Sequence, residues 1–181
     1  TGSENTAVGY QALLTATTAA NNTAVGMNSL ALTTTGTQNT AVGKSALVAN
    51  TTGIQNVAVG AESADASNNT AVGFAALEVN TTGANNVAVG KDALIRNTTG
   101  ATNVAVGVDC LQANTTASDN TGVGHSALEA NTTGASNTAV GKNSLGANTT
   151  GADNSAVGKS ALTTNTTGGQ NVAFGENALG S

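Results

Sequence analysis

The sequence is poor in the residues that build ordinary globular cores and active sites. Among its 181 residues there is no proline and no tryptophan, 2% are aromatic and 8% are charged, whereas 39% are hydrophobic. Globular domains carry about 25% charged residues, and aromatic side chains supply much of their core area. A core made of alanine, valine and leucine cannot fill a wide interior. The composition therefore predicts a thin, long molecule.

The scarcity of charge, cysteine and long apolar runs also excludes several functions. The five basic residues are scattered singly and the formal net charge is −5, so we expect no nucleic-acid partner. A single cysteine, Cys110, leaves no intrachain disulfide framework and no cysteine metal cluster. No apolar run approaches the ~18 residues that span a bilayer, and no signal-peptide pattern is present. We expect no membrane insertion by this segment.

A short repeat occupies the whole chain. Successive units are 17 residues long, except for one of 13 residues, and they read Asn-Thr-Ala-Val-Gly-x-x-Ala-Leu-x-x-Asn-Thr-Thr-Gly-x-x. They begin at Asn5, Asn22, Asn39, Asn56, Asn69, Asn86, Asn103, Asn120, Asn137, Asn154 and Asn171. We interpret 1–181 as one array of eleven coils beginning at Asn5, with one short coil at 56–68. Residues 1–4 fit the end of a preceding unit, so we expect a fragment of a longer fibre.

The period predicts an all-β parallel β-solenoid, because helical repeats need about 33 residues whereas one β-coil stacks about 4.8 Å from the next. Thr-Ala-Val (positions 2–4) is expected to form one strand and the stretch around Ala-Leu (positions 8 and 9) a second. Gly at position 5 suits the corner between them, and Asn-Thr-Thr-Gly (positions 12–15) suits another corner. We expect Asn at position 1 to form an amide ladder along the axis.

Variation among the units indicates which side chains face inward. Position 6 holds residues as different as Lys44, Phe74 and His125, so we expect it to face water. Positions 3 and 4 are both apolar, although successive strand residues point to opposite faces. One face must therefore meet another surface, most simply a copy of the same chain. We favour valine in the lumen and the small residues at the chain contact.

The short coil is the most informative irregularity. It lacks four residues of the Asn-Thr-Thr-Gly segment, and it carries Ala64 where the other units have leucine. This coincidence suggests that the segment is an outward loop that covers the leucine. We expect the strands around Val59 and Ala64 to stay in register with their neighbours.

The motif Asn-Val-Ala-Val-Gly-x-x-Ala, at Asn56, Asn86 and Asn103, resembles the repeat of trimeric autotransporter adhesin heads of the YadA-like type. The longer form, Asn5 to Leu13 followed by Asn-Thr-Thr-Gly, is similar to repeat arrays of bacterial and phage tail-fibre-domain proteins. This resemblance implies a left-handed parallel β-roll with three chains side by side. It also implies an extracellular location, on a cell surface or a virion fibre, and a role in display or attachment.

Residues with catalytic or metal-binding chemistry do not converge in the sequence. His125 lies at the variable position 6, and Cys110 replaces a small residue at position 8 as a buried substitute for alanine. The carboxylates are spread over different coils and positions, as at Glu62, Asp65, Asp92, Asp109, Asp119 and Asp153. We therefore predict no catalytic, cofactor-binding or metal site, and no enzyme.

The function that explains every fixed position is a structural shaft or head segment of an extracellular fibre or adhesin, which displays or attaches a distal tip. One alternative is binding of a host receptor or glycan along the exposed edge. A second is ice binding by threonine rows, such as Thr81-Thr82. The Asn-Thr-Thr sequences also match the N-glycosylation pattern, although turn chemistry explains them. They begin at Asn50, Asn80, Asn97, Asn114, Asn131, Asn148 and Asn165.

Overall fold

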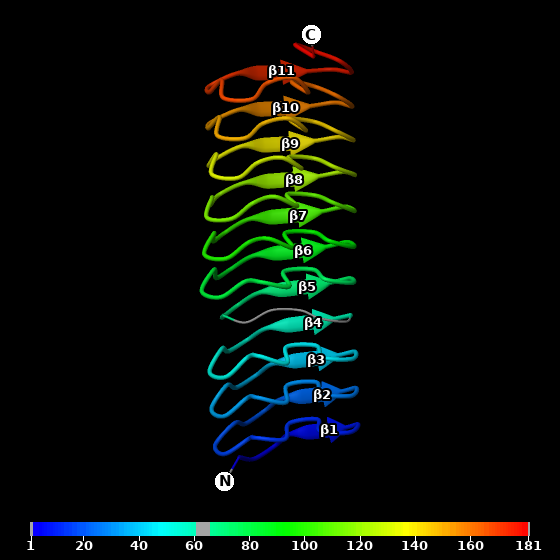
Figure 1. Ribbon diagram of the computed structural model, residues 1–181, viewed down its shortest axis with the longest axis vertical. Helices are drawn as coiled ribbons and strands as arrows, with labels where there is room; N and C mark the ends of the chain where they lie inside the picture. The colour runs from blue at the N-terminus through cyan, green and yellow to red at the C-terminus, as the bar shows by residue number, and fades with distance from the viewer. Residues whose placement is uncertain (1, 61–65, 181) are drawn as a thin grey trace.

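The computed structural model describes residues 2–60 and 66–180, and in it the chain is a parallel β-solenoid whose coils stack along one axis (Figure 1). Eleven strands of three residues form one sheet in sequence order, and each pairs parallel with the next. The strands are β1 (Thr6–Val8), β2 (Thr23–Val25), β3 (Thr40–Val42), β4 (Val57–Val59), β5 (Thr70–Val72), β6 (Val87–Val89), β7 (Val104–Val106), β8 (Thr121–Val123), β9 (Thr138–Val140), β10 (Ser155–Val157) and β11 (Val172–Phe174). The predicted β-solenoid of 17-residue coils is confirmed, whereas its left hand and the trimer stay predictions.

Each strand covers positions 2–4 of a coil and ends at the glycine of position 5. The β-branched residues at positions 2 and 4 favour extended backbone. The glycines then take φ values between 121° and 143°, where other residues are strained. Their backbones also touch, because a Cβ on Gly107 would lie 2.4 Å from the carbonyl oxygen of Gly124 in the next coil. The predicted glycine corner is confirmed.

The second strand predicted around Ala-Leu is wrong. After the corner the backbone forms turns, in which positions 7 and 9 take left-handed φ values, as at Asp92 (57°) and Leu94 (51°). A left-handed residue costs roughly 1–2 kcal/mol, but full burial of a leucine contributes about 1.5–3 kcal/mol. The turns let the coil reverse within a few residues and carry the leucine side chain inside.

The core is a narrow stack of alanine and leucine side chains. Ala88 and Ala105 at position 3 and Leu94 and Leu111 at position 9 are fully buried, whereas Val106 at position 4 is 36% exposed. The expectation of valine in the lumen is therefore wrong, and the alanine row faces inward. The reason is space: the leucines fill the lumen, and opposite them little more than a methyl group fits.

The short coil keeps its strand but changes the interpretation of the Asn-Thr-Thr-Gly segment. As predicted, β4 pairs in register with both β3 and β5; Ala64 lies outside the described residues. The segment is not an outward loop, because its asparagine and glycine are buried in full coils, as at Asn97 and Gly100. A Cβ on Gly100 would lie 2.2 Å from the carbonyl oxygen of Ala117, so the segment forms a tightly stacked wall of the coil.

Candidate functional surface

The asparagines of position 1 form the predicted ladder along the axis. The backbone N–H of Asn120 donates to Oδ1 of Asn103 (3.0 Å), and Nδ2 of Asn103 donates to Oδ1 of Asn86 (3.1 Å). Nδ2 of Asn103 also donates to the carbonyl oxygen of Ala117 at position 15 (2.9 Å). These buried amides are hydrogen-bonded at both ends, so they fix the register of the coils rather than bind a ligand.

A second asparagine ladder, at position 12, was missed by the sequence analysis. Nδ2 of Asn114 donates to Oδ1 of Asn97 (2.8 Å) and to the carbonyl oxygen of Ala117 (3.0 Å). The signal was present, because asparagine recurs at position 12 in every full coil from the third onward. Since Asn114 is buried and both hydrogens of its Nδ2 are donated, the folded coil does not offer this nitrogen for glycosylation.

The outward side chains of the sheet form one continuous surface without charge. We call it the outer sheet face, defined as positions 2 and 4 of β1–β11. Position 2 holds threonine, valine or, once, Ser155, and position 4 holds valine except for Phe174. Exposed fractions such as 37% for Val42 and 41% for Val59 show that the interior does not cover these side chains. Unlike the lumen, this face is therefore available to a partner.

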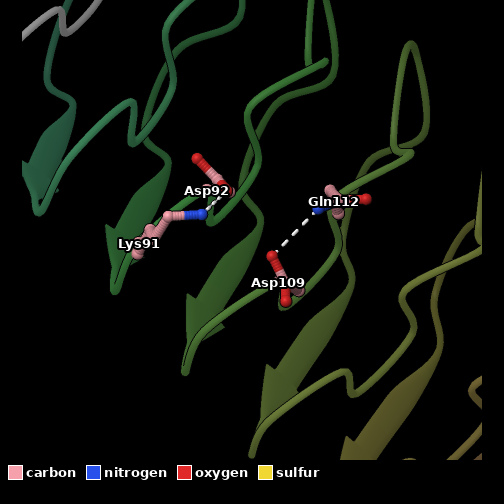
Figure 2. A network of polar contacts seen from close by, with 4 residues as sticks. All are labelled: Lys91, Asp92, Asp109 and Gln112. Carbon is pink, nitrogen blue, oxygen red and sulfur yellow. Dashed lines mark hydrogen bonds and ion pairs between the residues drawn. The ribbon is translucent and has the colours of Figure 1, made fainter.

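The row at position 6 follows the glycine corner and is exposed, as predicted, at Tyr10, Phe74 and His125. Its charged members make only local contacts: the ammonium group of Lys91 pairs with the carboxylate of Asp92, which raises the pKa of Lys91 (Figure 2). The other pair, Lys159 with Glu176 (2.7 Å), joins neighbouring coils and lowers the pKa of Glu176. Solvent screens the attraction in such exposed pairs, so they contribute little to the stability of the fold.

Of the carboxylates singled out in the sequence, Asp92 and Asp109 lie at position 7 of neighbouring coils, and the backbone N–H of Asp109 donates to the carbonyl oxygen of Lys91 (3.0 Å). Asp109 accepts a hydrogen bond from Nε2 of Gln112 in its own coil (2.9 Å; Figure 2), and Asp119 accepts one from Thr102. Asp153 is exposed at position 17, two coils beyond Asp119. Within the described ranges, no three histidine, cysteine or carboxylate side chains gather where they could hold a metal ion. Glu62 and Asp65 lie outside those ranges.

Cys110 is fully buried at position 8, as expected for a substitute for alanine. Burial raises the pKa of its thiol to about 12. Because the thiolate is the reactive form of cysteine, this side chain acts as a packing group.

In the parts of the chain that the structure describes, no helix has the length and apolar character needed to cross a membrane. The chain matches no protein-family model, no curated protein and no solved structure.

Proposed function

We propose that this chain is a non-enzymatic structural segment of an extracellular fibre or adhesin, in which three copies lie side by side through their outer sheet faces. The observation that carries the proposal is the outer sheet face itself. It is apolar or hydroxylic along all eleven strands, while the core is completed on the other side of the same sheet. The number three and the extracellular location rest on the resemblance to trimeric adhesin heads and tail-fibre arrays.

The size of the outer sheet face supports the proposal that another chain covers it. Eleven strands spaced about 4.8 Å apart extend about 50 Å, and the rows at positions 2 and 4 are about 7 Å apart. With the width of the side chains added, the strip covers several hundred Å². Position 2 is threonine or serine in seven of the eleven strands, so the row at position 4 is the apolar part of the strip that a partner would cover. An identical chain offers a matching strip of the same length and the same repeat.

Neighbouring residues of β6 and β7 provide the test. Val89→Asp with Val106→Asp places two charges on the outer sheet face, and Ala88→Asp places one in the lumen. We expect the valine pair to dissociate the oligomer while the circular dichroism of the coil is retained, because the lumen is untouched. Ala88→Asp should unfold the chain, since a buried unpaired charge has no compensation. Lys91→Asp at the exposed position 6 is the matched control and should do neither.

Light scattering gives the mass of each variant at equal concentration. A stable, folded monomer of the unmodified chain would refute the side-by-side assembly, and with it the fibre proposal in this form.

Two alternative functions each have support from particular residues. The exposed row at position 6, with Tyr10, Met27 and Phe74, could contact a host receptor or glycan, which a glycan array would detect. Threonines at position 14 are exposed in the full coils, which suits ice binding, but the short coil interrupts the row. The hydroxyls of position 13 are engaged, since Thr98 Oγ1 donates to the carbonyl oxygen of Thr115 (3.0 Å). A thermal hysteresis assay tests the ice-binding alternative.

A further inference from the structure

Two exposed rows of opposite charge flank the outer sheet face. Position 17 lies just before each strand and is exposed in every described coil. Its charged members are all acidic: Glu4, Asp119 and Asp153. Position 6 lies just after the glycine corner, at the other end of the strand. Four of the chain's five lysine and arginine residues lie there, although the chain as a whole is acidic: Lys44, Lys91, Lys142 and Lys159.

Both rows run along the axis, because the coils stack directly on one another (Figure 1). The backbone N–H of Asp153 donates to the carbonyl oxygen of Ala135 in the coil before it (3.1 Å), and that of Asn143 donates to the carbonyl oxygen of His125 (3.0 Å). Successive members of a row are therefore about 4.8 Å apart. The strand between the rows separates them by roughly 15–20 Å, at about 3.3 Å per extended residue. The two rows of one chain thus lie too far apart to pair with each other.

The charges that the chain itself leaves unbalanced lie beside β8–β10 in both rows. Near β6, Lys91 is already paired with the neighbouring Asp92. Beside β8–β10, position 7 carries no carboxylate, and no ion pair in the described ranges involves Lys142. Lys159 pairs with Glu176, but its ammonium group has three donors and can bind a second carboxylate. We call one set the basic border, namely His125, Lys142 and Lys159, and the other the acidic border, namely Asp119 and Asp153.

Symmetry decides which borders meet when two identical chains place their outer sheet faces together. If the chains run in the same direction, they are related by rotation about the fibre axis. Position 17 of one chain then meets position 6 of the other at the level of the same coil. If the chains run in opposite directions, the rotation axis is perpendicular to the fibre and like borders meet. Opposite charges therefore favour parallel chains, and like charges disfavour antiparallel ones.

We propose that the acidic border of one chain binds the basic border of an identical chain, with the two chains parallel and level coil by coil. At β8, Asp119 of one chain faces His125 of its neighbour, and at β10, Asp153 faces Lys159. This inference rests on the proposed contact between outer sheet faces. It adds the direction of the chains, their register and the charged residues that select both, whereas the valines of position 4 contribute apolar area in any register.

Cross-linking tests the register with variants that keep all the charges. Thr102 and Val108 are exposed at positions 17 and 6 on either side of β7. A full-length chain with both Thr102→Cys and Val108→Cys should form covalent dimers and trimers with a short bismaleimide. Each single variant should not, and neither should Asn21→Cys with Val108→Cys, which lie five coils apart, about 24 Å. The unmodified chain is the control, because its one thiol is buried.

Charge reversal tests the contact itself. His125→Asp places a carboxylate against Asp119 of the neighbouring chain, and at low salt it should raise the concentration of half-dissociation about tenfold. Adding Asp119→Lys should restore assembly. Because the two residues of one chain are too far apart to touch, this recovery can come only from contact between chains. Salt at about 1 M should remove both effects, since it shortens the screening length to about 3 Å. Lys91→Asp is the matched control, since Lys91 faces the uncharged Asn85 in this register.

The outcomes separate this inference from the proposed assembly. An oligomer that cross-links through Thr102→Cys alone, or through the pair five coils apart, would overturn the parallel, level arrangement and leave the side-by-side assembly standing. An oligomer that cross-links in none of the variants would also overturn it, because the borders would then not meet. Assembly only upon addition of dextran sulfate would show that the basic border binds a polyanion instead of the acidic border. A monomer under all conditions would refute both proposals.

Discussion

Cys110 and Gly122 provide a prediction that depends on the direct stacking of one coil on the next. Cys110 occupies position 8 of the seventh coil, where most units have alanine or serine, and Gly122 is the one glycine at position 3. A Cβ added to Gly122 would lie 2.5 Å from Sγ of Cys110, well inside contact distance. Both residues are buried, so the larger residue in one coil is matched by a smaller residue in the next.

The magnitudes follow from this contact. Gly122→Ala alone should destabilise the chain, because overpacking costs about 1–3 kcal/mol and the loss of glycine freedom in the unfolded state returns only about 0.4–1 kcal/mol. Cys110→Ala alone leaves a small cavity and should cost about 1 kcal/mol. The double variant recreates the pair of alanines that Ala76 and Ala88 supply at the same positions of other coils, so the two changes should couple by about 2 kcal/mol.

Urea unfolding of the four proteins, followed by circular dichroism at one protein concentration, measures this coupling. The reverse substitutions at the same positions of the preceding coils are the control. Ala93→Cys alone should destabilise the chain, and adding Ala105→Gly should restore part of the lost stability. Additive effects in both cycles would show that positions 8 and 3 of successive coils do not touch, and would refute the stacking register.

Three further changes test other parts of the coil. The thiol of Cys110, whose pKa is raised to about 12, should resist maleimide at pH 8 in the folded chain and react only when urea unfolds it. Gly107→Ala should lower the free energy of unfolding by about 3 kcal/mol or more. Alanine is strained at the φ of 141°, and its Cβ would lie 2.4 Å from the carbonyl oxygen of Gly124. A fully stable variant would disprove the close backbone stacking. Asn114→Ala should lower the free energy of unfolding by about 3 kcal/mol through the loss of three buried hydrogen bonds, whereas Thr116→Ala on the exposed row should change it by less than about 0.5 kcal/mol.

The parts of the fold that repeat without exception could be predicted from the sequence. Asparagine at position 1 and glycine at position 5 are the same in all units, because a ladder and a close backbone contact each accept one residue type. The strand at positions 2–4 follows from its β-branched residues and its place before the glycine. These elements depend on local chemistry, which a single repeat displays.

The direction of the faces could not be predicted in the same way. Alternation shows that Ala88 and Val89 point to opposite sides, but both are apolar, so hydrophobicity does not decide which one faces the lumen. The decision comes from volume, since Leu94 and its equivalents occupy the interior. The left-handed φ of Leu94 could not be predicted either. Leucine is common in strands and helices, and the strain of this backbone angle is offset only by burial of the side chain within the coil.

The two asparagine ladders respond differently to the short coil, and this difference shows which part of the repeat the fold requires. The position-1 ladder passes through it: the N–H of Asn69 donates to Oδ1 of Asn56 (3.0 Å), and that of Asn86 donates to Oδ1 of Asn69 (2.9 Å). The position-12 ladder stops at Asn50, yet β3, β4 and β5 stay in register. The corner asparagine, the strand and the glycine therefore suffice to stack a coil, and one coil can omit the Asn-Thr-Thr-Gly wall.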